Sequence, residues 1–282
     1  MERHSDPMLR KIIAAHQAAP SVRPSTTVPS LKRLSGVKAV LFDVYGTLLL
    51  SERNNPGPDG RPDEATLERL KAFVVKYGLA LEAERLVPAF LGLIDKTNKT
   101  AATRGVAVPE VNVIHIWHRL LGGGDYRTLK RLALEFEMIV HHCRPAGDLA
   151  ALFAFLRSRN IMLGIVSNAQ FYTAHILEYF LGRSLTGAGF DKKLILYSYI
   201  YRNAKPSEKL FQKAVTRVTQ RGLHPDNVLF AGDSLENDIR PAGRAGFRTA
   251  LFCGSAATVR PAADIGIDAI LTDWKQIERI LC

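Results

Sequence analysis

Two kinds of hydrophobic pattern alternate along this chain of 282 residues. Short, continuously apolar runs are typical of strands that are buried on both faces of a parallel sheet. They occur at residues 40–42, 161–166, 194–196, 228–231 and 249–252, with a further short run at 269–271. Helical stretches lie between them, as at residues 147–159. Strands that alternate with helices predict an α/β fold built on a doubly wound parallel (Rossmann-like) sheet.

A long helical stretch separates the first strand from the second. Apolar residues recur there at three- and four-residue spacing. The stripes include Leu67 with Phe73, Leu86 with Phe90, Ile116 with Trp117, and Phe136 with Ile139. Pro109 is expected to open the third helix, and the segment 51–62, rich in Gly, Pro and Asn, predicts a loop. We therefore expect a helical domain at residues 53–143, inserted into a sheet domain made of residues 38–52 and 144–282.

Residues 1–37 precede the first strand as an extension. Residues 7–19 predict one amphipathic helix, and residues 20–30, with three prolines, predict an extended linker. Residues 1–38 also carry seven Lys or Arg against two acidic residues, nearly half of the net charge of +11. A docked helix, an oligomerisation arm and a disordered tail are all compatible with this pattern.

Polar side chains follow the apolar run of several predicted strands. They are Asp43, Ser167 with Asn168, Lys205, and Asp233 with Asp238. Because parallel strands end at the same edge of a sheet, these side chains can converge where open α/β sheets place their ligands. Clustered carboxylates repel one another unless a cation joins them, and hard oxygen ligands of this kind suit Mg²⁺.

These strand ends resemble, in order, the motifs of the haloacid dehalogenase-like (HAD) superfamily. The segment 43–47 reads DVYGT where the family has Asp-x-Asp-Gly-Thr. Ser167-Asn168 is similar to the second motif, Lys205-Pro206 to the third, and the segment 232–238, GDSLEND, to the fourth. The resemblance covers about residues 38–280.

The resemblance implies a role for each matched residue. Asp43 would be the nucleophile that forms a covalent aspartyl intermediate. Ser167 and Asn168 would bind the transferring group, and Lys205 would compensate its charge. Asp233 and Asp238 would hold Mg²⁺ together with Asp43. The helical insertion would be a cap that excludes water and supplies specificity contacts.

Tyr45 departs from the family pattern. The phosphatases of the family have a second Asp here that protonates the leaving alcohol, and a phenol with a pKa near 10 is a weak acid at neutral pH. Tyr at this place resembles the 2-haloacid dehalogenases, in which a halide leaves without a proton and no metal is needed. A catalytically weak binding module with the basic extension as its contact surface is a third possibility. We favour a Mg²⁺-dependent phosphatase of a small phosphorylated metabolite, because the acid pair Asp233 and Asp238 makes little physical sense without a cation.

Composition, targeting signals, cysteines and charge indicate the general class of the protein. The chain is 47% hydrophobic and 23% charged, which is typical of a globular protein. It lacks a secretory signal pattern and an apolar run of the roughly 18 residues that a membrane span needs, and its three cysteines are far apart, so we expect a cytoplasmic protein. No cluster of basic and aromatic residues predicts nucleic-acid binding, and the positive charge favours a small anionic substrate instead. The pair His141-His142 is interpreted as a helix end rather than a metal site. The physiological substrate and the oligomeric state stay open.

Overall fold

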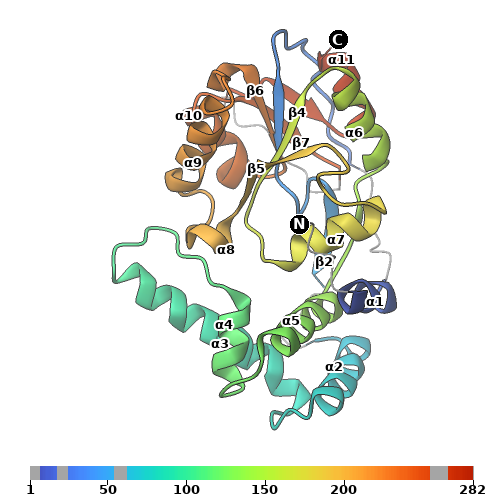
Figure 1. The fold of residues 1–282 in the computed structure, drawn as a ribbon, viewed down its shortest axis with the longest axis vertical. Coiled ribbons are helices and arrows are strands. Elements are labelled where there is room, and N and C mark those ends of the chain that lie inside the picture. Colours follow the sequence, from blue (N-terminus) through green and yellow to red (C-terminus); the bar gives the residue numbers. More distant parts are fainter. Residues whose placement is uncertain (1–6, 18–24, 54–61, 255–265, 282) are drawn as a thin grey trace. The chain divides into compact units, whose positions relative to one another are not determined.

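The computed structural model describes residues 7–17, 25–53, 62–254 and 266–281 of the chain (Figure 1). The chain forms two compact units, each of which is described by itself. The helical unit comprises residues 1–21 and 51–143, and the sheet unit comprises residues 22–50 and 144–282. The N-terminal extension, which the sequence suggests as a segment of its own, is thus divided between the two units.

The sheet unit is built on a six-stranded sheet in the order β5-β4-β1-β6-β7-β8. Its strands are β1 (Ala39–Phe42), β4 (Met162–Ser167), β5 (Phe190–Tyr197), β6 (Val228–Gly232), β7 (Arg248–Phe252) and β8 (Ala269–Leu271). Every neighbouring pair is parallel, which confirms the predicted doubly wound sheet. The chain moves outward to β4 and β5 on one side of β1, and to β7 and β8 beyond β6 on the other. The strand order therefore reverses between β1 and β6, the position where such sheets bind ligands.

Helices cover both faces of this sheet (Figure 1). On one face, α9 (Glu208–Thr219) and α10 (Arg240–Arg244) cover a buried cluster in which the rings of Phe211 and Phe230 are 5.3 Å apart. On the other face, Phe42 lies 5.9 Å from Phe153 of α6 (Leu149–Ser158) and 5.4 Å from Trp274. Since β1 is buried on both faces, its residues are apolar without alternation.

The remaining elements of the sheet unit are short. They are α7 (Tyr172–Leu181), α8 (Ser198–Tyr201), α11 (Ile277–Leu281), a π-type turn (Leu235–Ile239) and 3₁₀ turns at Pro225–Asn227 and Trp274–Gln276. The sequence pattern did not predict α7 or α8. A two-residue antiparallel bridge also joins Ser30 to Ile270 of β8, with N–H···O distances of 3.0 and 2.8 Å. The second half of the N-terminal extension thus lies along the outer edge of the sheet.

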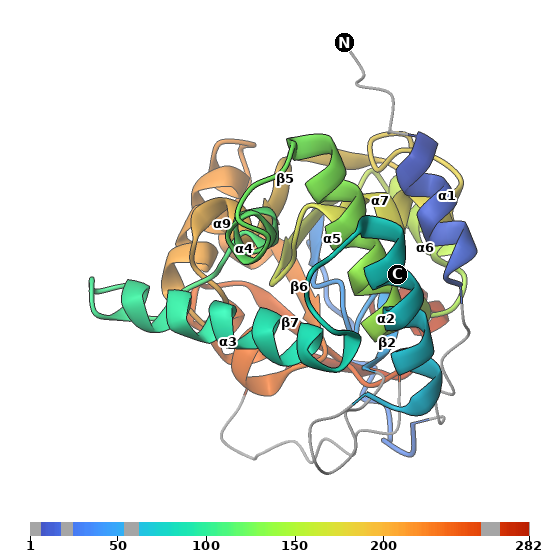
Figure 2. The same cartoon turned by 90° about the horizontal axis from the view of Figure 1, so that it is seen from below.

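The helical unit confirms the four predicted apolar stripes (Figure 2). Its helices are α1 (Pro7–Ala15), α2 (Glu64–Tyr77), α3 (Ala83–Ala102), α4 (Val113–Leu120) and α5 (Tyr126–Val140). Asp63, Asn112 and Asp125 cap the starts of α2, α4 and α5 by accepting backbone N–H groups. The apolar faces meet in an aromatic cluster of Phe73, Phe90, Trp117 and Phe136, with ring centroids 4.9–6.2 Å apart. Trp117 is fully buried.

Several predicted boundaries in this region are wrong. The third helix begins at Val113, because Asn112 and not Pro109 caps it. The chain passes between the two units along β2 (Leu49–Arg53) and β3 (His141–Pro145), which pair with each other. Residues 51–53 are therefore strand and not loop, and His141 begins a strand directly after α5. Pairing between segments 90 residues apart leaves no local signal. The rest of the predicted loop, residues 54–61, lies outside the described residues.

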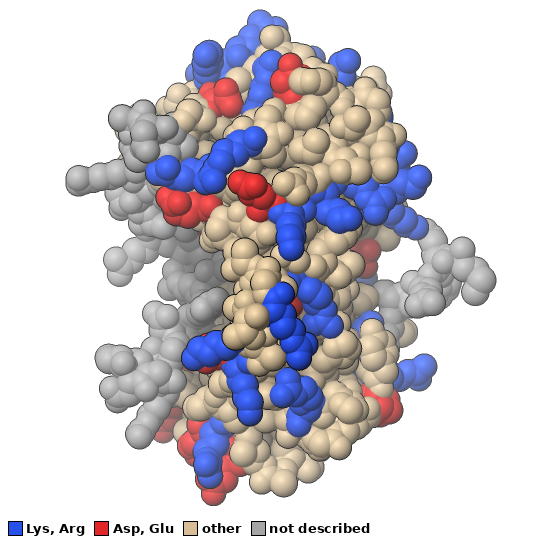
Figure 3. All heavy atoms as spheres, turned by 90° about the vertical axis from the view of Figure 1, so that its left-hand side faces the viewer, with Lys and Arg blue, Asp and Glu red and all other residues tan. Residues whose placement is uncertain are grey.

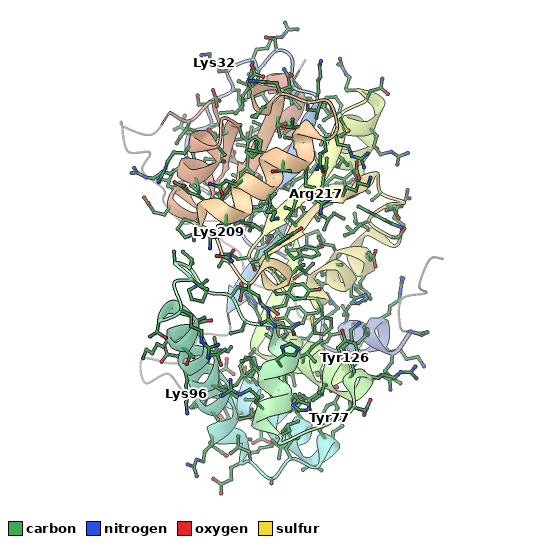
Figure 4. The ribbon with its side chains drawn as sticks, turned by 60° about the vertical axis from the view of Figure 1, so that its left-hand side comes forward. Lys32, Tyr77, Lys96, Tyr126, Lys209 and Arg217 are labelled. Atoms are coloured by element: carbon green, nitrogen blue, oxygen red, sulfur yellow. The ribbon has the colours of Figure 1, made fainter. Side chains whose placement is uncertain are left out.

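The N-terminal helix α1 belongs to the helical unit, where it packs on α5 (Figure 2). Its Leu9, Ile12 and Ile13 are buried. The Glu135 side chain of α5, only 5% exposed, accepts a hydrogen bond from Tyr77 Oη at 2.8 Å, lies 3.2 Å from His16 Nε2, and pairs with the Lys76 ammonium. Figure 4 places Tyr77 in the helical unit. Of the three possibilities for the extension, the structure shows the docked helix for residues 7–15.

Glu135 joins three helices, and we expect Glu135→Gln to lower the free energy of unfolding by about 2 kcal/mol at pH 7. Burial alone would raise its pKa, but hydrogen bonds from His16, Lys76 and Tyr77 lower the pKa to about 2. A lowered pKa in the folded state stabilises at pH values above the unfolded value near 4.5, and this contribution is lost as the pH falls through about 2. Urea unfolding should therefore show a difference between variant and wild type that narrows between pH 5 and pH 2.

Glu68→Gln is the matched control, because Glu68 makes an exposed ion pair with Lys71 within α2. Exposed pairs of this kind contribute little to stability. An equal loss in both variants, or a Glu135→Gln difference that does not depend on pH, would contradict the role of the Glu135 charge.

None of the described helices is both long enough and apolar enough to span a membrane.

On the face of the molecule drawn in Figure 3, Lys and Arg side chains are spread among uncharged ones, with acidic residues between them. Lys209 and Arg217, at the two ends of α9, are part of this distribution (Figure 4).

Candidate active site

Asp43 stands at the reversal point of the sheet, one residue beyond β1. Its backbone N–H still donates to Ala231 O of β6, at 2.9 Å. The chain then turns sharply, since the N–H groups of Thr47, Leu48 and Leu49 all point to Val44 O. Gly46 permits this turn with a φ of +87°, a backbone conformation that favours glycine. The carboxylate of Asp43 is thereby fixed at the carboxyl edge of the sheet, and it is 5% exposed.

Lys205 connects Asp43 with Asp238, the acid after β6. Its Nζ donates to Asp43 Oδ1 and to Asp238 Oδ1, each at 2.5 Å, and the residue is 4% exposed. Burial disfavours the charged amine, but the carboxylates of Asp238 and Asp43 outweigh that effect and raise the pKa of Lys205. Lys205 lies outside the next helix, because Ser207 caps α9 and the helix begins at Glu208. Lys205 is thus held by carboxylates and not by a helix terminus.

Three carboxylates converge at this point. One oxygen each from Asp43, Asp233 and Asp238 lies within 4.8 Å of the others. Asp238 Oδ2 also accepts the Ser234 N–H at 3.0 Å. Burial, followed by the charges of Asp43 and Asp238, raises the pKa of Asp233 to about 7. Burial and Asp43 likewise raise the pKa of Asp238 to about 6, although Lys205 opposes this.

This donor set fits a hard divalent cation. Three carboxylates surround the single Lys205 ammonium, and carboxylates that lie this close repel one another when they are ionised. Carboxylate oxygens are the ligands that Mg²⁺ prefers. Asp43, Asp233 and Asp238 are therefore the residues that could hold such an ion.

Two glycines make room for the acids. A Cβ atom on Gly46 would overlap the Asp233 carboxylate, and one on Gly232 would lie 2.5 Å from Asp238 Cγ. Atoms at that separation clash, so any side chain at either position must displace a carboxylate. The glycines of the first and fourth motifs thus leave the space that the Asp233 and Asp238 carboxylates occupy. The sequence alone did not show this role.

Asn168 reaches Lys205 rather than the acids. Its Oδ1 accepts the Lys205 N–H at 2.6 Å, and its Nδ2 donates to Lys205 O at 3.1 Å. Both polar groups of the Lys205 backbone are therefore held by one side-chain amide. These two hydrogen bonds fix the Lys205 backbone, and the predicted binding of the transferring group by Asn168 stays a prediction.

Ser167, at the end of β4, offers a free hydroxyl. The side chain is fully buried, and its Oγ has no hydrogen-bond partner in the described part of the chain; the same holds for Oγ1 of Thr47. A buried hydroxyl without a partner is costly. Both atoms are suited to an oxygen-rich ligand.

Tyr45 points its hydroxyl group toward α7. Its Oη lies 3.1 Å from Oγ1 of Thr173, a fully buried residue near the start of that helix. Sequence reasoning missed Thr173, because the two residues are 128 positions apart and no motif marks the threonine.

The sequence of this chain is similar to sequences of known proteins. Residues 37–246 match the family described as haloacid dehalogenase-like hydrolases. Pyrophosphatase PpaX of Oceanobacillus iheyensis is 33% identical over 127 residues, which are 45% of this chain. The chain spans about half the length, 55%, of this curated relative.

Two solved structures are similar in fold. The HAD phosphatase from Thermococcus onnurineus has a TM-score of 0.51 and 19% identity, covering 86% of this chain and 97% of that one. The 2-haloacid dehalogenase from Pseudomonas syringae pv. Tomato DC3000 has a TM-score of 0.56 and 20% identity, with the same coverage. At these identities the likeness concerns the fold and does not distinguish the two activities.

Proposed function

Because this chain belongs to the haloacid dehalogenase-like hydrolases, we propose that it is a Mg²⁺-dependent phosphohydrolase that acts on a small anionic phosphate compound. The observation that supports this proposal is the convergence of Asp233 and Asp238 on Asp43, within 4.8 Å. Attack on a carbon atom with departure of a halide needs the nucleophile but not two further acids. A phosphoryl group, with several charged oxygens, needs the cation that those acids would hold.

The first step uses the carboxylate of Asp43. One of its oxygens attacks the phosphorus atom, a bond forms between them, and the bond from phosphorus to the leaving oxygen breaks with its electron pair on the leaving group. The Lys205 ammonium orients the Asp43 carboxylate through the hydrogen bond to Oδ1. Asn168 in turn holds the Lys205 backbone, so the ammonium is placed before substrate arrives.

In the second step a water molecule attacks the phosphorus of the aspartyl phosphate. The bond to Asp43 breaks, phosphate leaves, and the carboxylate is restored. The Ser167 hydroxyl would donate to a phosphoryl oxygen in both steps, which would satisfy its missing hydrogen bond. Asp43, Asp233 and Asp238 would hold Mg²⁺, which would supply positive charge near the phosphoryl oxygens.

Tyr45 narrows the class of substrate. A neutral phenol is a poor proton donor at neutral pH, so leaving groups that depart as stable anions are favoured. Phosphoanhydrides, acyl phosphates and aryl phosphates have such leaving groups. The partial relative is named a pyrophosphatase, and pyrophosphate is a phosphoanhydride, which supports this choice.

The helical unit is proposed to act as a cap that determines which substrates enter. A cap would exclude water from the aspartyl phosphate and add contacts to the rest of the substrate. A cytoplasmic location is part of the same proposal, and it agrees with Cys143 and Cys253 being free thiols buried in the structure.

A second candidate, the 2-haloacid dehalogenase, is favoured only by Tyr45. Phosphate release from pyrophosphate and from p-nitrophenyl phosphate, measured with Mg²⁺ and with EDTA, separates the two. We expect release that depends on Mg²⁺ and no chloride from 2-chloropropionate. Chloride release in EDTA would establish the dehalogenase instead. No turnover in either assay, together with no binding of beryllium fluoride, would indicate a binding module.

A further inference from the structure

The Tyr45 ring is held at both of its ends. Its backbone lies in the turn after Asp43, where Gly46 N–H donates to Leu49 O at 2.7 Å and three N–H groups point to Val44 O. Its hydroxyl group lies 3.1 Å from Oγ1 of Thr173. A side chain fixed at the Cα atom and at the hydroxyl has little freedom to change rotamer.

Thr173 is itself immobilised. It is the second residue of α7, it is 0% exposed, and its N–H donates to Gln170 O at 3.1 Å. Its Oγ1 is therefore a fixed point for the hydroxyl group of the partly exposed Tyr45. All of these contacts lie within the sheet unit.

We propose that Thr173 is a positioning residue, which holds the Tyr45 ring beside the reacting group and so defines the leaving-group side of the site. This inference rests on the proposed function. In the family pattern a carboxylic acid stands at the position of Tyr45, two residues beyond the nucleophile. Here a neutral ring, whose hydroxyl group contacts Thr173, takes that place and supplies no strong acid. Thr173 thus contributes to selecting leaving groups that need no proton.

A double-mutant cycle tests whether Thr173 acts through the Tyr45 hydroxyl. With p-nitrophenyl phosphate and Mg²⁺, we expect Thr173→Val to lower kcat about fivefold, the range that one lost hydrogen bond gives, and to change KM less than twofold. Thr173→Ser keeps the hydroxyl and should restore most of kcat. In the Tyr45→Phe background, Thr173→Val should cause almost no further loss, because the bond is already absent.

Thermal unfolding of each variant controls for folding, and Thr173→Ala replaces the valine variant in the cycle if that one does not fold. Equal losses in the wild-type and Tyr45→Phe backgrounds, or a Thr173→Ser variant as impaired as Thr173→Val, would reduce Thr173 to a packing residue and overturn the inference. Failure of the proposed function looks different: the wild-type protein would then release no phosphate with Mg²⁺, and the positioning role would fall with it.

Discussion

Replacing Asp43 with Asn is expected to abolish phosphate release, with a loss in kcat of about 10⁴-fold or more. The substitution keeps the shape of the side chain but removes the charged oxygen that attacks phosphorus. It also removes one of the two carboxylates that hold Lys205 Nζ. The amide is a much weaker nucleophile than the carboxylate, so the covalent intermediate should no longer form. Initial rates with pyrophosphate under saturating Mg²⁺ measure the effect.

Asp226→Asn is the matched control, because Asp226 belongs to the same unit, is 61% exposed and pairs only with the exposed His224 in the described structure. Its activity should stay within twofold of the wild type. Retention of more than a tenth of the wild-type kcat in Asp43→Asn would show that Asp43 is not the nucleophile. In that case Asp43, Asp233 and Asp238 could still bind a metal ion, but Asp43 would not form a covalent intermediate.

Replacing Gly46 with Ala is expected to lower kcat by about 10²-fold, because a displacement of about 1 Å in a catalytic group can cost that much. A Cβ atom at this position would overlap the Asp233 carboxylate. The carboxylate must move, and the distances between the three acids change. The affinity for Mg²⁺, measured by calorimetry in the absence of substrate, should fall in parallel.

Backbone strain has to be separated from this displacement. Gly222 offers the control, since its φ is +73° but nothing lies within 4 Å of its Cβ position. Alanine is strained at both glycines, by about 1 kcal/mol, yet only Gly46→Ala should lose activity and Mg²⁺ affinity. Similar kinetics for the two variants would indicate that the acid cluster tolerates the shift.

The sequence could predict the six strands of the main sheet, the four helices of the insertion and the residues at the strand ends, because each depends on a local pattern. Asp43 at the end of a buried apolar run is an example: the run fixes the strand, and the strand fixes the edge of the sheet at which the carboxylate appears. The order of the motifs then predicted that Lys205 and the two later acids would meet it.

Contacts between distant segments could not be predicted in this way. Asn168 was expected to bind the transferring group, yet its amide matches the backbone of a residue 37 positions later. Glu135 is one polar residue in a helix with an apolar stripe. Its side chain nevertheless contacts Tyr77 of α2, 58 positions away, and His16, 119 positions away and just after α1. The helix α7 was missed although Tyr172, Ile176 and Phe180 recur there at four-residue spacing, and no motif marks its Thr173.

The family match begins at residue 37, but the extension before it is part of the folded protein. A chain trimmed to the matched region would lose the two backbone hydrogen bonds that Ser30 makes to the outer side of β8. That border strand would then present unpaired N–H and C=O groups, which are a template for intermolecular strand pairing. The helical unit would at the same time uncover the apolar surface of α5 on which Leu9, Ile12 and Ile13 pack. The segment ahead of the catalytic machinery therefore also protects the molecule against self-association.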